Sequence, residues 1–63
     1  MNYVDQIIAF EQGELDENQI VELFAHLVRT GQAWTLQGAY GRMAKALMYQ
    51  GYLDEEGNIL QYV

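Results

Sequence analysis

The absence of cysteine from a chain of only 63 residues constrains its fold more than any other feature. Without cysteine, neither a disulfide nor a thiolate metal site can stabilise the fold. A domain of this size buries only about 60% of the surface that its unfolded chain exposes, so its margin of stability is narrow. Apolar residues make up 51% of the chain, which is ordinary for a globular protein. We therefore expect one domain over residues 1–63, whose core is either efficiently packed or completed by a second subunit.

Charge is distributed unevenly along the chain. The formal net charge is −6, from nine acidic and three basic residues. Six acids lie within residues 1–24, all three bases within residues 25–53, and three more acids at residues 54–56. Because phosphate backbones bind mainly through Lys and Arg, this balance argues against a nucleic-acid partner.

The start of the chain lacks the basic and apolar regions of a signal peptide. No apolar run approaches the roughly 20 residues that a membrane span needs. We therefore predict a soluble protein of a reducing cytoplasm, with no membrane association.

Two helices are predicted in the first half of the chain. Apolar residues at helical spacing indicate the first over about residues 3–12, with Asn2 as its N-cap and Gly13 after its last turn. The second begins at Asp16, which forms a capping box with Gln19, and ends at Gly31. Only a short turn separates the two helices, so we expect an antiparallel hairpin.

A third helix is predicted from residue 35 or 36 to residue 50, with Gly51 as its stop and Tyr52 packing back on Leu47. The cluster DEEGN then lies between short apolar segments, with Gly57 suited to a positive φ, and predicts a β-hairpin. The expected fold is therefore mainly α: a small three-helix domain with a helical hairpin and a short C-terminal β-hairpin.

The segment AWTLQGAYGR places two glycines near the start of the third helix, where each costs roughly 1 kcal/mol relative to alanine. One interpretation is close packing, in which Gly38 and Gly41 let another backbone approach and a larger side chain would clash. The other is a ligand or partner that uses exposed amides at the helix start. The pattern lacks the glycine and lysine spacing of a phosphate loop.

Trp34, the only tryptophan, has two interpretations. If Trp34 plugs the open end of the helical hairpin, its truncation should lower the free energy of unfolding by roughly 3–5 kcal/mol. As an interface anchor, it would belong to a residue type enriched in binding hot spots. Periodicity places Tyr40 in the core. Arg42 and Lys45 are expected to be dispensable for folding and needed for binding, on a polar face beside Trp34 that includes Gln32 and Gln37.

No residue set indicates catalysis or a bound cofactor. His26 is the only histidine, so we expect it at the surface or half buried rather than as a metal ligand. There is no calcium loop among the acids and no nucleophile with a supporting base. We therefore expect no enzyme activity, no cofactor and no metal.

Two other functions share these features. The order of helices followed by a hairpin matches a winged helix-turn-helix, in which Arg42 and Lys45 would reach DNA, although its wing tip would be acidic. Alternatively, the acids of residues 1–24 could mimic the phosphates of nucleic acid.

Residues 27–53 resemble a group of very short, uncharacterised proteins of tailed bacteriophages. The shared core is TG-x-AW-x-LQG-x-YGR, carried here by residues 30–42. The resemblance implies a phage origin and, by association, an accessory protein of the host cytoplasm that acts by binding a host protein. We also expect a homodimer, because the apolar third helix and an open hairpin edge offer surface for self-association.

Overall fold

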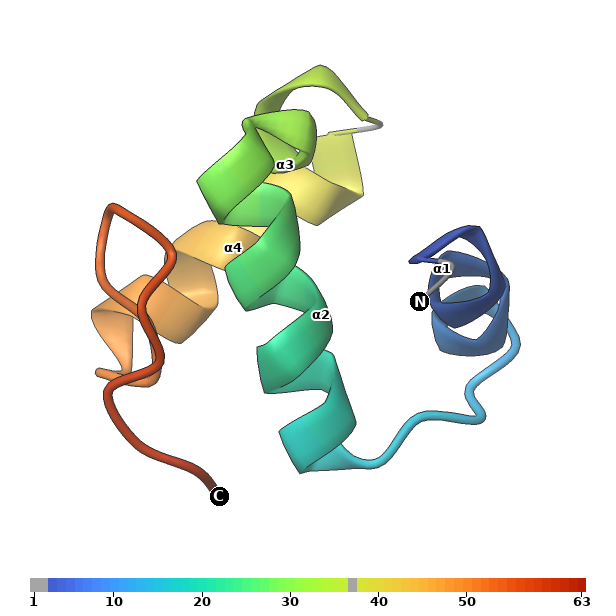
Figure 1. Ribbon diagram of the computed structural model, residues 1–63, viewed down its shortest axis with the longest axis horizontal. Helices are drawn as coiled ribbons and strands as arrows, with labels where there is room; N and C mark the ends of the chain where they lie inside the picture. The colour runs from blue at the N-terminus through green and yellow to red at the C-terminus, as the bar shows by residue number, and fades with distance from the viewer. Residues whose placement is uncertain (1–2, 37) are drawn as a thin grey trace.

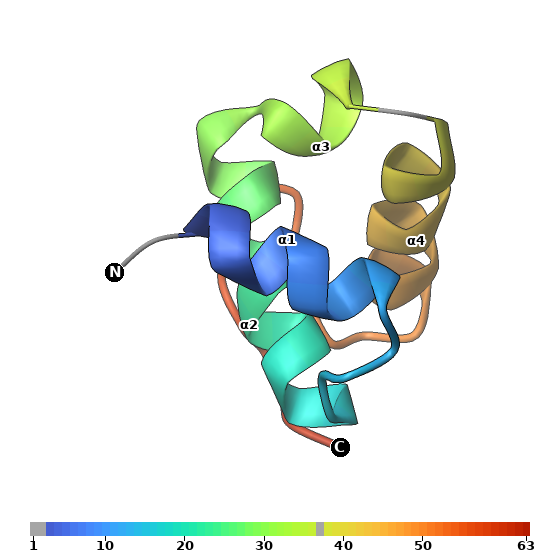
Figure 2. The same cartoon turned by 90° about the vertical axis from the view of Figure 1, so that its right-hand side faces the viewer.

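The computed structural model describes residues 3–36 and 38–63, and within these ranges it contains four helices. They are α1 (Tyr3–Glu11), α2 (Glu17–Thr30), α3 (Gln32–Thr35) and α4 (Gly38–Tyr49). In Figure 1, α2 runs through the middle of the molecule, with α1 on one side and the C-terminal tail on the other. Figure 2, turned by 90°, shows α1 crossing over α2 while α4 stands beside them.

The start and end of α2 lie where the sequence predicts them. The Asp16 carboxylate accepts a hydrogen bond from the Gln19 backbone N–H at 2.7 Å, and the Gln19 side chain accepts one from the Asp16 N–H at 2.9 Å. Gly31 ends the helix with a φ of 82° and donates its N–H to the carbonyl of Val28. The predicted capping box and left-handed stop are both confirmed, and they fix the length of the central helix.

Helix α1 packs on α2 but buries none of its residues fully. Tyr3, Ile7 and Phe10 pack partly buried against the core, whereas Val4 and Ile8 remain exposed. Gly13 has a φ of 74° after the last turn, as predicted. The N-cap predicted at Asn2 lies outside the described residues.

The third helix that we predicted from residue 35 or 36 to residue 50 corresponds to α4, which begins two or three residues later, and an additional short helix, α3, precedes it. Leu36 is extended, with φ −78° and ψ −176°, and separates α3 from α4. Both helices contact α2 and each other. Hydrophobic spacing did not predict α3, because a helix of four residues is too short for helical periodicity to show.

Helix α4 ends as the sequence predicts. Gly51 has a φ of 85°, its N–H bonds to the carbonyl of Met48, and the Tyr52 N–H bonds to the carbonyl of Leu47 at 2.9 Å. These two bonds form a Schellman end. The chain therefore reverses at Gly51 and returns toward α2.

The predicted C-terminal β-hairpin is wrong. Among the described residues, the tail contains only one isolated antiparallel bridge, between Leu53 and Ile59. The turn is held instead by Asp54, whose carboxylate accepts hydrogen bonds from the backbone N–H of Glu56 and from the backbone and side chain of Asn58. These bonds lower the pKa of Asp54. Two backbone hydrogen bonds flank the bridge, from the Asp54 N–H to the Asn58 carbonyl and from the Leu60 N–H to the Tyr52 carbonyl. The chain then runs beside α2 and ends with the Val63 N–H on the Asn18 Oδ1 at 2.7 Å.

One core holds the helices and the tail together. Helix α2 contributes more than half of its buried residues, which fits its central position. The buried hydrophobic residues are Val21, Leu23, Phe24, Ala25, Leu27, Val28, Ala33, Tyr40, Ala44, Leu47 and Leu53.

Candidate functional site

A shallow cavity of about 210 Å³ lies between α3 and α4, and we call it the α3–α4 hollow. Apolar and small residues line most of it, and two basic side chains complete it. The lining residues are Ala33, Trp34, Leu36, Gly38, Gly41, Arg42 and Lys45. The structure therefore brings together Trp34, Arg42 and Lys45, three of the four residues predicted to bind a partner.

Trp34 is 48% exposed, so it does not plug the core. Its neighbour Ala33 is the residue of α3 that is buried. The indole ring lies close to Gly41, where an added Cβ would stand 3.7 Å from the Trp34 Cε3. Half of the ring thus remains available to another molecule, and truncation should cost less folding free energy than we expected of a core plug.

The two glycines of this segment differ in their surroundings. An added Cβ at Gly41 would lie 3.5 Å from the carbonyl oxygen of Ala33, which is an ordinary contact that alanine can make. At Gly38 it would meet only the Arg42 Nη1, at 3.4 Å. Close backbone packing is therefore wrong for Gly38. At Gly41 a side chain larger than alanine would overlap with the ring of Trp34, which covers the position.

Arg42 and Lys45 are exposed at the edge of the hollow. The contact of Arg42 with Gly38 places its guanidinium over the first turn of α4. No acidic residue lines the hollow with them. Gln32 is exposed nearby, where its carbonyl accepts the Leu36 N–H, and Gln37 lies outside the described residues.

A family model described as a domain of unknown function (DUF7417) matches residues 1–63. The chain belongs to the DUF7417 family. No curated protein matches the chain, and no solved structure does.

In this DUF7417 domain, Tyr40 is a core residue, as its spacing predicted. It is 5% exposed, and its ring packs against those of Phe10 and Phe24 at centroid distances of 5.7 and 5.9 Å. Its hydroxyl donates a hydrogen bond to the Glu11 carboxylate at 2.9 Å. Burial, and then this carboxylate, raise the pKa of Tyr40 to about 12. Tyr40 therefore joins α1, α2 and α4.

His26 is half buried on α2, as expected. Its ring stacks on that of Tyr3, with centroids 3.5 Å apart and planes 1° from parallel. The contact ties the start of α1 to the second half of α2. Among residues 3–36 and 38–63, no three His, Asp or Glu side chains gather in a group that could hold a metal ion.

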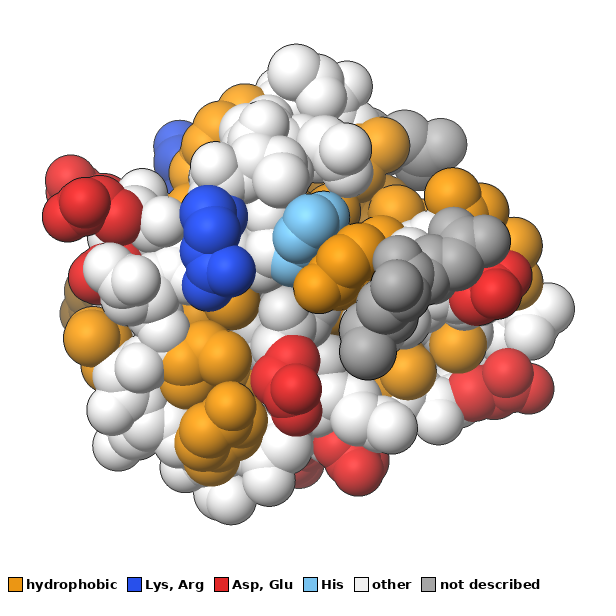
Figure 3. Space-filling view, in the orientation of Figure 1, with side chains coloured by type: hydrophobic (Ala, Val, Ile, Leu, Met, Phe, Trp, Pro, Cys, Tyr) orange, Lys and Arg blue, Asp and Glu red, His pale blue; other side chains and the backbone are white. Residues whose placement is uncertain are grey.

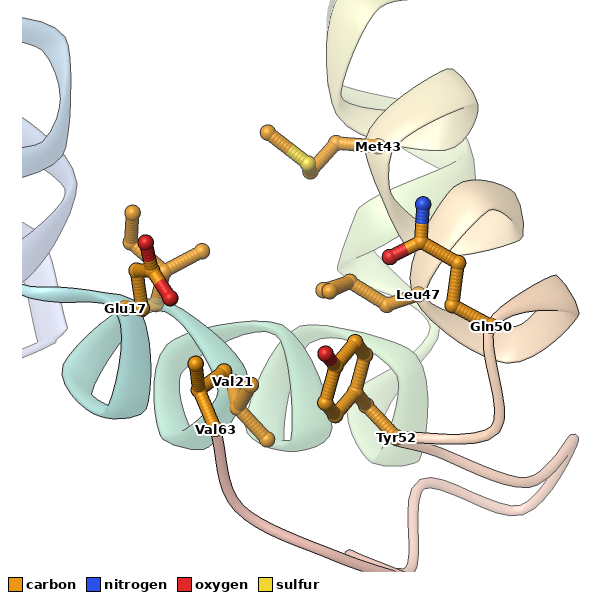
Figure 4. Close-up of a pocket in the computed structure, with 8 residues that line it drawn as sticks. Glu17, Val21, Met43, Leu47, Gln50, Tyr52 and Val63 are labelled. Atoms are coloured by element: carbon orange, nitrogen blue, oxygen red, sulfur yellow. The ribbon is translucent and has the colours of Figure 1, made fainter.

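A second cavity, of about 280 Å³, lies between α2, α4 and the tail. Figure 4 shows Val21 and Val63 facing Met43 and Leu47 across it, with Tyr52 at one end. The remaining polar side chains are Glu17 and Gln50, which offer no nucleophile with a supporting base. This groove is an apolar surface and shows no catalytic arrangement.

The sequence did not reveal how closely Gly57 approaches α2. A Cβ there would lie 2.6 Å from the carbonyl oxygen of Ala25 and 2.9 Å from the backbone nitrogen of Arg29. Arg29 in turn donates from its Nη2 to the Gly57 carbonyl at 3.0 Å. The DEEGN cluster predicted the positive φ of Gly57, which is 87°, but no local signal states which helix the turn meets.

No helix in the described part of the chain has both the length and the apolar character needed to cross a membrane.

Proposed function

We propose that the protein is a non-enzymatic bacteriophage accessory protein that binds a host protein through the α3–α4 hollow. One observation carries the proposal: six of the ten residues of the motif on which the phage resemblance rests line the hollow. Of its lining residues, all but Lys45 belong to the segment AWTLQGAYGR. A shared motif that had only a packing role would be expected to face the core instead.

The size of the hollow favours protein side chains over a small molecule. Pockets for small ligands usually enclose roughly 300–1,000 Å³ and bury most of the ligand. The α3–α4 hollow, of about 210 Å³, is smaller and open. A half-exposed tryptophan beside an arginine is instead typical of a hot spot in a protein interface.

The two alternative functions have less support. A winged helix contacts DNA partly through its β-hairpin, and here the tail has one isolated bridge and an acidic turn with Glu55 and Glu56 exposed. A phosphate mimic needs its acids in a regular row. On the face shown in Figure 3, acidic side chains lie in separate groups at the left, at the right and in the lower middle, and form no row.

The test is capture of host proteins on the immobilised chain and on matched variants. We expect a host protein that is retained by the parent and by Tyr49→Ala and lost from Trp34→Ala and Arg42→Ala. Tyr49 is 93% exposed and lies outside the hollow, so it controls for loss of any surface aromatic ring. Circular dichroism must show that every variant is folded. The proposal would be overturned if the Trp34→Ala and Arg42→Ala variants still captured the host protein. It would also be overturned if the protein bound DNA with a steep dependence on salt concentration.

We also propose that the protein forms a homodimer. The hairpin edge that first suggested this is absent from the described residues, but Leu60, Tyr62 and Val63 of the tail are each more than half exposed, and Val63 lines the apolar groove between α2 and α4. A second copy would cover them. Light scattering at micromolar concentration should give twice the chain mass of 7.3 kDa, and the monomer mass would contradict the proposal.

A further inference from the structure

Resting on the proposed function, we infer that the α3–α4 hollow binds a short acidic segment of the partner, with one apolar side chain seated against Trp34. The occupant is thus a peptide of stated chemistry: a central aliphatic or aromatic residue flanked by carboxylates. Two independent properties of the hollow, its charge and its apolar floor, point to this occupant.

The first property is charge. The chain has three basic residues, and two of them border this one hollow. The third, Arg29, is engaged with the Gly57 carbonyl on the tail. All nine acids lie outside the lining of the hollow. In a molecule of net charge −6, this is therefore the place where a negatively charged segment meets attraction instead of repulsion.

The second property is the apolar floor between the cations. Trp34 and Leu36 are 48% and 38% exposed. On the α4 side of the hollow, Gly41 has no side chain to fill the space next to them. A space bounded in this way accepts an aliphatic or aromatic group. Burial of such a side chain contributes more binding free energy than an exposed ion pair does, because the ion pair is screened by solvent. The apolar residue should therefore supply most of the affinity, and the carboxylates should select the partner.

The small number of basic residues favours a peptide over nucleic acid. Phosphate binding depends on releasing many counterions, and two cations release few against the repulsion of nine acids. A peptide needs only one carboxylate for each cation. The presence of only two cations also limits the acidic segment to a few residues. A longer acidic segment would extend beyond the hollow and be repelled by the acidic side chains on the rest of the surface.

The sole tryptophan provides the measurement, because its fluorescence reports on the hollow alone. The probe is a short synthetic peptide with a central leucine flanked by glutamates and without tryptophan, titrated to about 1 mM. We expect a saturable change in Trp34 emission. Replacing the leucine by alanine should weaken binding about tenfold. Replacing the glutamates by glutamines should weaken it about two- to fivefold for each lost ion pair.

Variants of the protein complete the test. Arg42→Gln and Lys45→Gln should each weaken the glutamate peptide and leave the glutamine peptide unchanged. Gln12→Glu is the matched control: it alters net charge by the same amount, at an exposed position away from the hollow, and should bind as the parent does.

The inference is overturned if the glutamate and glutamine peptides bind equally, if neither binds, or if a DNA oligonucleotide binds in preference. Its failure can be told from that of the proposed function. Host-protein capture that still depends on Trp34 and Arg42, with no binding of the acidic peptide, would leave the proposed function standing and remove this partner chemistry alone.

Discussion

Gly57 shows how far one residue can determine the position of a whole segment. Its carbonyl accepts a hydrogen bond from the Arg29 guanidinium. Because it has no side chain, the tail lies directly on the backbone of α2. The close approach requires a residue with no Cβ, and the φ of 87° also favours glycine. The tail is therefore attached to the middle of α2 at a point where no other amino acid fits without movement.

Gly57→Ala should accordingly destabilise the protein by about 2–4 kcal/mol, from a positive φ that alanine disfavours and from the overlap with Ala25. Gly38→Ala is the matched control, since its Cβ would meet only the tip of Arg42. That variant should stay within about 1 kcal/mol of the parent, on the stabilising side. Urea unfolding followed by circular dichroism measures both. Equal stabilities for the two variants would show that the tail does not depend on this approach.

The Tyr40–Glu11 hydrogen bond predicts a pH dependence. The pKa of Tyr40 is raised from 10.0 to about 12 in the folded protein, so the native state holds its proton more tightly than the unfolded chain does. The contribution is fully present below pH 10 and is lost as the pH rises toward 12. Melting temperatures measured over this range should fall more steeply for the parent than for Tyr40→Phe. Parallel curves would contradict the assignment.

At the scale of elements, helix ends were predictable from sequence, whereas connections that depend on distant contacts were not. Asp16, Gly31 and Gly51 carry their own local chemistry, and each ends or begins a helix where expected. The extended Leu36 follows from the packing of α3 and α4 on α2. The absent hairpin follows from the attachment of the tail to α2. In the candidate site, the sequence indicated Trp34, Arg42 and Lys45 but missed Leu36, which was expected at the start of the third helix and is instead the extended residue after α3.

The capping box of α2 gives a prediction for this scale. Asp16→Ala removes the acceptor for the Gln19 N–H and should cost about 1 kcal/mol of folding free energy. Asp16→Asn keeps an acceptor oxygen and should cost less, which makes it the matched control. Thermal unfolding compares the two. If the Asp16→Ala variant were as stable as the Asp16→Asn variant, the start of α2 would have to be fixed by packing alone.

For the whole molecule, excess negative charge should oppose folding. Nine acids and three bases, with no pair of charged side chains in the buried core, leave a net repulsion that salt screens. We expect the melting temperature to rise as ionic strength increases to about 0.15 M and beyond. Glu55→Gln, at an exposed position, should reduce this dependence. A melting temperature that falls with added salt would instead mean that favourable ion pairs dominate.

The absence of any fully buried residue in α1 has a consequence for the way the molecule opens. Helix α1 is held by partly buried side chains, among them Tyr3 and Phe10, and accepts a hydrogen bond from Tyr40 at Glu11, whereas α2 contacts each of the other three helices. Amide hydrogen exchange in α1 should therefore proceed through a partial opening, and in α2 only through global unfolding. The faster exchange would then measure how strongly α1 packs on the rest of the domain, and only the slower one the stability of the fold.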